Sequence, residues 1–286
     1  MFKFNKPNAE IYFPQGAGDD RILARTTHLG IGAHQDDLEI FAIHGILAGL
    51  DNREKAFTGV TVTDGRGAPR SGPYADMSDD TLWKVRNAEQ KKAADIGHYN
   101  AQILLDHASR ELMSSDRDAV IADLQQIIRM TQPESIYTHN LADKHATHLS
   151  VALSVIEALR TLIPPLPSVT LYGCEVWGDL DWLPDEIKVA LDVSGHAELQ
   201  KRLLDVYESQ IVGGKRYDLA AIGRRVANAT YYQSHQTDQA SRLTYAMDLT
   251  PLIRDPDLNI NNFILEKIDQ FKNDVANRLE RLITHQ

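Results

Sequence analysis

Residues 29–39 have the sequence Leu-Gly-Ile-Gly-Ala-His-Gln-Asp-Asp-Leu-Glu. The apolar, glycine-bearing run that ends at Ala33 predicts a buried strand of a parallel sheet, and the apolar spacing after the two aspartates predicts a helix. His34, Asp36 and Asp37 therefore lie where a strand gives way to a helix. In open α/β sheets that edge binds ligands. Three ionisable side chains at this point favour a bound divalent cation.

The composition narrows the function classes. The 286 residues include 30 basic and 40 acidic side chains, and the net charge of −10 disfavours non-specific binding to nucleic acid or to an anionic membrane. Cys174 is the only cysteine, so there is neither a disulfide framework nor a thiolate zinc cluster. Residues 1–20 lack the apolar core of a signal peptide, and no run approaches the roughly 20 apolar residues of a membrane span. We expect a cytoplasmic protein with neither nucleic acid nor integral membrane as a partner.

Short β-rich runs alternate with longer helical patterns in the first half of the chain. The predicted strands are 26–33, 57–63, 101–105 and 134–138, and the predicted helices are 38–50, 81–97, 115–130 and 147–162. This alternation indicates an α/β fold with a mostly parallel sheet and right-handed crossovers. Residues 64–80 form a glycine- and proline-rich loop of a length that is typical of functional loops.

The pattern changes after residue 166. Strands are predicted at 168–176 and 187–193, and helices at 196–210, 217–232 and 259–283. No linker separates independent units. We expect one domain over 1–286, with a core at about 25–170 and a C-terminal α/β extension at about 171–286. The amphipathic terminal helix predicts an outer layer or a subunit contact in a homo-oligomer.

A second polar cluster follows the predicted strand 134–138 and contains His139, Asp143, His145 and His148. Because the carboxyl ends of parallel strands share one edge, we expect both clusters to line one pocket. Imidazole and carboxylate suit zinc, and a catalytic zinc site has three protein ligands and a water. Structural alternatives are a helix-capping carboxylate at the first cluster and a solvated first helical turn at the second.

Three of these side chains, His34, Asp37 and His148, can supply the ligands of such a site. A bound metal lowers the pKa of its water toward about 7. Asp36 then lies where it can take the proton of that water and return it to a leaving amine. His145 can stabilise the oxyanion that develops on an attacked carbonyl.

The two clusters also resemble the signatures of a known family. Residues 33–39 resemble the Ala-His-Pro-Asp-Asp-Glu motif of the PIG-L/LmbE-like de-N-acetylases, and residues 145–148, His-Ala-Thr-His, resemble their His-Pro-Asp-His motif. Arg86-x-x-Glu89 matches their Arg-x-x-Glu helix. The resemblance runs in order over about 27–160. It implies a Rossmann-like three-layer fold and a zinc-dependent hydrolase, with one Zn²⁺ per chain, that removes an acyl group from an amino sugar or a small glycoconjugate.

Carried over position by position, the resemblance makes His34, Asp37 and His148 the metal ligands. It makes Asp36 the general base and acid, and His145 the oxyanion stabiliser.

Three departures from the family pattern bear on the rate. Gln35 replaces a proline, and Leu38 is inserted before Glu39. Thr147 stands where the family often has an aspartate that partners the non-ligand histidine. Asp143 is the nearest residue that could take over that role.

Further candidates lie around the expected pocket. Arg86, Asp64 and Arg66 could bind substrate, and Arg70 belongs to the same loop; surface ion pairs and a solvated loop are the alternatives. His139 is expected to support a ligand or to cap its strand. Trp177 and Trp182 could stack on a sugar ring or belong to the core. The sequence does not choose between these roles.

Competing functions are less well supported. Gly30-x-Gly32 after a strand invites a dinucleotide site, but the third glycine position holds Gln35 and two aspartates would face the pyrophosphate. No Gly-x-Ser-x-Gly elbow is present. The remaining rival is a non-catalytic, metal-stabilised protein that binds a sugar or a nucleotide. Asp36 favours the enzyme, because a purely structural site has no use for that aspartate.

Overall fold

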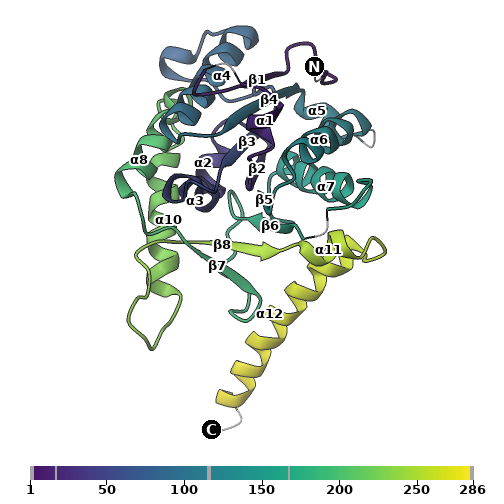
Figure 1. Cartoon of the computed structure of the whole chain (residues 1–286). Helices are drawn as coiled ribbons and strands as arrows, with labels where there is room; N and C mark the ends of the chain where they lie inside the picture. The colour runs from purple at the N-terminus through teal and green to yellow at the C-terminus, as the bar shows by residue number, and fades with distance from the viewer. Residues whose placement is uncertain (1–2, 17, 115–116, 167, 284–286) are drawn as a thin grey trace.

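The computed structural model describes residues 3–16, 18–114, 117–166 and 168–283 (Figure 1). Within these ranges the strands are β1 (Glu10–Tyr12), β2 (His28–Gly32), β3 (Phe57–Thr63), β4 (Ala101–His107), β5 (Ser135–His139), β6 (Thr170–Cys174), β7 (Lys188–Asp192) and β8 (Leu243–Asp248). They form one sheet in the order β1-β4-β3-β2-β5-β6-β8-β7. The central pairs, from β4 through β6, are parallel, whereas β1, β8 and β7 pair antiparallel with their neighbours. The predicted mostly parallel α/β fold is confirmed.

Helices cover both faces of this sheet. The helices are α1 (Asp20–Leu23), α2 (Asp37–Phe41), α3 (Ile43–Asp51), α4 (Asp79–Ile96), α5 (Ser109–Leu112), α6 (Asp118–Thr131), α7 (Ala146–Arg160), α8 (Ala197–Asp205), α9 (Glu208–Ile211), α10 (Tyr217–Tyr231), α11 (Thr250–Arg254) and α12 (Ile260–Ile283), with a 3₁₀ turn at Gly72–Tyr74. In Figure 1, α5, α6 and α7 lie on one side of the sheet, and α2, α3, α4, α8 and α10 lie on the other. The result is a three-layer sandwich.

The burial of the central strands follows from these two helical layers. Every residue of β2 and β3 is buried, as expected for parallel strands that are covered on both faces. One apolar cluster includes Ile31, Leu124 and Val151, and a second includes Leu38 and Phe57. Apolar side chains thus pack against both faces of the sheet, and this packing fixes the position of its carboxyl edge.

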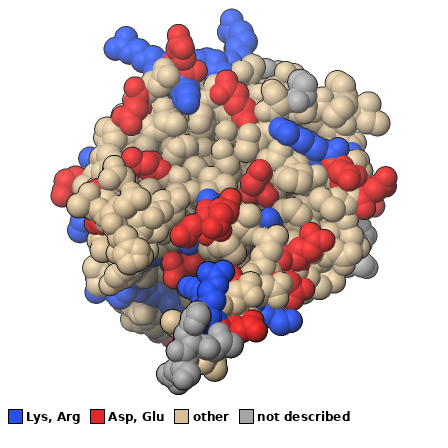
Figure 2. Space-filling model, turned by 90° about the horizontal axis from the view of Figure 1, so that it is seen from below, with Lys and Arg blue, Asp and Glu red and all other residues tan. Residues whose placement is uncertain are grey.

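The C-terminal extension continues the same sheet. β8 lies between β6 and β7 and pairs antiparallel with both. The helix α12 projects away from the body (Figure 1) and exposes Leu265, Leu279 and Leu282. None of the helices in the described ranges has the length and apolar content needed to cross a lipid bilayer. Figure 2 shows acidic and basic side chains interspersed on the face seen from below, without an extended basic field.

Most element predictions match within a few residues, and the strand at 57–63 has the predicted bounds. The helix predicted over 38–50 is interrupted at Ala42, whose backbone leaves the helical region and separates α2 from α3. The helix predicted over 196–210 likewise ends at Asp205 and resumes as α9. The helix predicted to begin at Ser115, which lies outside the described residues, begins by Asp118.

Five helices and strands were not predicted. β1 and α1 lie in the segment 1–25, for which little regular structure was expected. α5 follows the predicted strand 101–105, and β8 and α11 lie between the last two predicted helices. β1 and β8 depend on pairing with β4 and β6, which are distant in the sequence, so local periodicity alone did not identify them.

Candidate metal centre

The turn that follows β2 is held by hydrogen bonds at both of its ends. The backbone N–H of Ala33 donates to Nε2 of His139 over 2.9 Å, and the backbone N–H of His34 donates to Oδ2 of Asp37 over 2.7 Å. Gly32 allows α2 to approach the strand, because a Cβ at this position would lie 3.0 Å from Cβ of Asp37. The turn thereby aims His34 and Asp37 at the carboxyl edge of the sheet.

Asp36 has a strained backbone and a carboxylate that does not cap α2. Its φ of 96° lies in the left-handed region, which is costly for a residue other than glycine and is often found at functional sites. It occupies the N-cap position of α2, yet its side chain makes no capping hydrogen bond. Its Oδ2 lies 3.5 Å from Nη2 of Arg86, which also donates to the carbonyl of Gln35 over 2.7 Å. Asp36 is therefore not explained as a helix cap.

The three predicted ligands come together. Nδ1 of His34 lies 3.3 Å from Oδ2 of Asp37 and 3.2 Å from Nε2 of His148, and this Nε2 lies 3.4 Å from Oδ1 of Asp37. Ligands bound at 2.0–2.1 Å in a tetrahedral zinc site are separated by about 3.3 Å. The donor set and its spacing therefore fit a zinc ion.

Other histidines surround this cluster and widen the choice of donors. Donor atoms of His34, His145 and His148 lie within 4.8 Å of one another, and so do those of Asp37, His139 and His148. Nε2 of His139 already accepts the Ala33 N–H, so its lone pair is engaged. His139 therefore stabilises the turn after β2 through this hydrogen bond.

Asp143 contacts a different histidine from the one considered in the sequence. Its Oδ2 lies 3.4 Å from Nδ1 of His148 and accepts the backbone N–H of Trp177, and its Oδ1 accepts the backbone N–H of His145. The expectation that Asp143 replaces the missing aspartate opposite the His145 ring is therefore not met: Nδ1 of His145 is buried without a hydrogen-bond partner among the described residues. A carboxylate behind a ligand histidine orients its ring and increases its basicity.

Burial and neighbouring charges separate the two adjacent aspartates. Burial raises the pKa of Asp36 well above its ordinary value, although Arg86 acts against this. Burial acts in the same sense on Asp37, but His148 and His139 hold the pKa of Asp37 well below its ordinary value.

The histidines respond in opposite directions. Burial lowers the pKa of His34 and of His145. The pKa of His148 is raised despite its burial, because Asp37 and Asp143 flank it. The pKa values of the two adjacent carboxyls are thus shifted in opposite directions, a pattern that separates an acid–base group from a ligand.

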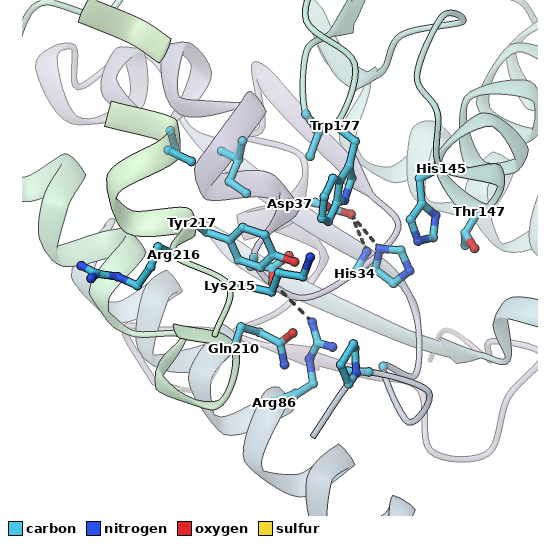
Figure 3. Close-up of a pocket in the computed structure, with 18 of the residues that line it drawn as sticks. His34, Asp37, Arg86, His145, Thr147, Trp177, Gln210, Lys215, Arg216 and Tyr217 are labelled. Atoms are coloured by element: carbon cyan, nitrogen blue, oxygen red, sulfur yellow. Dashed lines mark hydrogen bonds and ion pairs between the residues drawn. The ribbon is translucent and has the colours of Figure 1, made fainter. Parts of the chain in front are cut away.

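The cluster opens into a cavity of about 850 Å³ (Figure 3). The lining from the first half of the chain includes His34, Asp36, Asp37, Arg86, His145 and Thr147. The C-terminal extension contributes Trp177, Gln210, Lys215, Tyr217 and Arg224. Lys215 and Tyr217 point toward the cluster in Figure 3, whereas Arg216 points away.

The charged side chains Asp64, Arg66 and Arg70 of the loop 64–80 do not line the cavity. The guanidinium of Arg66 pairs with Asp64, Asp80 and Asp106 and lies over the Trp83 ring. Residues that line the cavity include Gly65, Gly67, Ala68 and Pro69 but not Asp64, Arg66 or Arg70. The structure thus brings Arg86 to the cavity and uses Asp64 and Arg66 to brace the loop. Trp182 also lies outside the lining and packs on Phe271.

The sequence analysis missed the C-terminal wall and its attachment to α2. Glu39, displaced by the Leu38 insertion, accepts hydrogen bonds from the hydroxyls of Tyr99 and Tyr207, each over 2.5 Å. Arg225 donates to the carbonyls of Glu39 and Ile40. The Gly-Gly-Lys-Arg sequence at 213–216 predicts a basic loop, but it does not indicate that Lys215 lies near the metal centre.

Comparison with known proteins finds one similar family and several structures with the same fold. The family model described as GlcNAc-PI de-N-acetylase, PIG-L, matches residues 29–159. These residues are similar to the PIG-L family, and we call them the PIG-L region. This PIG-L region carries both polar clusters and Arg86. A sequence search among curated proteins finds no match.

Solved structures share the fold over most of the chain. The 4-carboxy-2-hydroxymuconate hydratase GalB from Pseudomonas putida is 18% identical, with a TM-score of 0.61 and coverage of 78% of this chain and 96% of that one. The conserved protein TT1542 from Thermus thermophilus is 17% identical, with a TM-score of 0.60 and coverage of 82% and 99%. The N,N'-diacetylchitobiose deacetylase from Pyrococcus horikoshii is 18% identical, with a TM-score of 0.59 and coverage of 78% and 84%. At these identities the likeness establishes the fold alone.

Proposed function

We propose that this chain is a metal-dependent hydrolase that removes an N-acyl group, in particular acetyl, from an amino sugar or a small glycoconjugate. The observation that carries the proposal is the spacing of 3.2–3.4 Å between donor atoms of His34, Asp37 and His148, beside an Asp36 that caps nothing. The PIG-L match and the named substrate of the chitobiose deacetylase support the choice of an amino sugar.

His34, Asp37 and His148 would hold one Zn²⁺ per chain. When bound, zinc polarises a carbonyl and lowers the pKa of water toward about 7. Asp143 faces His148 from behind and fixes the orientation of its ring.

Asp36 would move the proton. Burial raises the pKa of Asp36, and a carboxyl with a raised pKa is suited to serve as base toward water and then as acid toward the leaving amine. Arg86, 3.5 Å away, moderates that shift and orients the carboxylate.

His145 would stabilise the oxyanion. Its ring lines the cavity beside the cluster, and the ring centroid lies 5.1 Å from that of His34 and 4.6 Å from that of His148. A neutral imidazole still carries one N–H, and this donor is sufficient for an oxyanion that develops at the cluster. The role does not require an aspartate at position 147.

The test compares wild type with Asp36→Asn. Asn keeps the shape but cannot accept the proton, so we expect an unchanged zinc content and a fall of about 10²–10⁴-fold in amine release from N-acetylglucosamine derivatives. Asp76→Asn, an exposed position in the loop 64–80, is the matched control and should retain full activity. A wild-type protein that binds zinc but releases no amine from any N-acyl sugar would instead support the non-catalytic sugar- or nucleotide-binding function.

A further inference from the structure

The cavity wall has an uneven distribution of charge. The acidic side chains that line it are Asp36 and Asp37, and both belong to the metal centre. The Lys and Arg side chains in the lining are Arg86, Lys144, Lys215, Arg216 and Arg224, so basic side chains outnumber acidic ones there. In a chain with a net charge of −10, this cavity therefore concentrates positive charge.

Three of these cations form no ion pair in the part of the chain that the structure describes. Arg86 faces Asp36, and Arg216 pairs with Asp218 and points away from the cavity (Figure 3). By contrast, Lys144 and Lys215 take part in no ion pair within the described residues, and Arg224 donates to the carbonyl of Val176.

The three side chains come from separate elements and meet at one cavity. Lys144 follows β5 in the turn before α7, Lys215 lies in the loop before α10, and Arg224 lies within α10. Nζ of Lys215 lies 5.0 Å from the centroid of the Trp177 ring, which also lines the cavity. Single surface lysines are often unpaired, but three unpaired cations around one concave, aromatic-lined wall form a site for an anion.

We propose that the substrate carries an anionic group, a phosphate or a carboxylate, away from its N-acyl group, and that Lys144, Lys215 and Arg224 bind it. This inference rests on the proposed function for the position of the N-acyl group. Trp177 would offer its face to the sugar ring between the two ends, since an aromatic ring packs well on an apolar sugar face.

The first experiment measures binding by calorimetry to the zinc-loaded Asp36→Asn protein, which keeps the cavity and suppresses turnover. The probes are N-acetylglucosamine and three anionic derivatives: its 1-phosphate, its 6-phosphate and N-acetylmuramic acid. We expect at least one anionic probe to bind tenfold or more tightly than N-acetylglucosamine. The preference should shrink as sodium chloride rises from about 50 to 500 mM, because salt screens exposed charges. The two phosphates and the carboxylate distinguish the kind of anion and its position.

The second step adds Lys144→Gln and Lys215→Gln together. These exposed positions tolerate the change without loss of folding, which circular dichroism checks. The double variant should lose at least tenfold affinity for the preferred anionic probe and much less for N-acetylglucosamine. Lys92→Gln, at an exposed position of α4 away from the cavity, is the matched control and should bind as the parent does.

The outcomes separate this inference from the proposed function. Equal affinity for neutral and anionic probes, or a preference that survives the double substitution, would overturn the anion site. Amine release by wild type from neutral and anionic sugars at equal kcat/KM would overturn it too, while the deacetylase function stands. Lysine-dependent binding of an anionic probe without amine release from any N-acyl sugar would keep the anion site and refute the deacetylase.

Discussion

The PIG-L region and the C-terminal extension share one sheet but contribute different things to the cavity. The PIG-L region supplies the candidate ligands and the groups that would move protons, on the turns and first helical turns that follow β2 and β5. The extension supplies other parts of the wall, with Trp177, Lys215, Tyr217 and Arg224. The proposed chemistry therefore uses side chains that are close together in the sequence, whereas the proposed substrate contacts depend on residues that are distant from them in the sequence.

The two regions are not independent. Tyr207 and Arg225 of the extension bond to Glu39 and to backbone carbonyls of α2, and Ser209 donates to Glu89 on α4. The wall is thus attached to the helix that carries Asp37.

The largest effect is expected where the chemistry alone is removed. His148→Gln deletes one donor of the proposed triad and leaves Lys144, Lys215 and Arg224 in place. We expect zinc content, measured by mass spectrometry, to fall from about one per chain to near zero and amine release to drop more than about 100-fold. Binding of the anionic probe should survive. His235→Gln, at an exposed position, is the control; a zinc-replete His148→Gln protein would contradict the proposed ligand set.

The sequence predicts the part of the site that lies in the PIG-L region better than the part that lies in the C-terminal extension. His34, Asp37 and His148 could be placed because each follows a strand whose apolar run is visible, and parallel strands bring their carboxyl ends to one edge. Lys215 could not, because its distance from the cluster depends on β6, β7 and β8 adding to the sheet. The direction of Asp143 toward His148 also depended on the turn that only the structure describes. Arg66 does not line the cavity, because its guanidinium pairs with three carboxylates that are spread over the sequence.

The second prediction contrasts the two ends of β2. His28, at the opposite end from the metal centre, is buried beside the Tyr137 ring, and burial, with Lys55 nearby, lowers the pKa of His28 to about 4. Because the folded pKa lies below the unfolded value of about 6.5, the unfolded chain binds more protons between pH 6.5 and 4. Stability is therefore retained above pH 6.5 and lost as the pH falls toward 4, by about 2 kcal/mol at pH 5.

Urea unfolding at pH 7, 6 and 5 tests this for wild type and for His28→Asn, which cannot titrate in this range. The stability difference between the two proteins should change by about 2 kcal/mol in favour of the variant as the pH falls. Parallel curves at all three pH values would show that His28 does not titrate as expected.

The third prediction concerns a substitution that weakens the contact between the two regions. Tyr207→Phe removes one of the two hydroxyls that bond to the buried Glu39 and leaves that carboxyl partly unsatisfied. We expect a loss of about 1.5 kcal/mol in the free energy of unfolding. KM for the amino sugar should rise, because the wall moves relative to α2. Tyr231→Phe, whose side chain is exposed, should change neither quantity. If Tyr207→Phe is as stable as wild type, Glu39 does not depend on the extension.

The smallest effect is expected inside the PIG-L region itself, at the loop that borders the cavity. Gly65 has a φ of +68°, and a Cβ there would lie 2.3 Å from Oε1 of Gln35, the residue that precedes Asp36. Gln35 in turn donates to Asn87 over 2.9 Å. Gly65→Ala should therefore cost about 1 kcal/mol for its backbone conformation and displace the Gln35 amide. Gly67→Ala is the matched control, since a Cβ at Gly67 meets nothing within 4 Å and its φ is not in the left-handed region. Thermal unfolding and amine release should both fall for Gly65→Ala and stay unchanged for Gly67→Ala. If only stability falls, Gln35 moves without disturbing Asp36, and the proline that the family has at position 35 is replaced here without consequence for the reacting carboxylate.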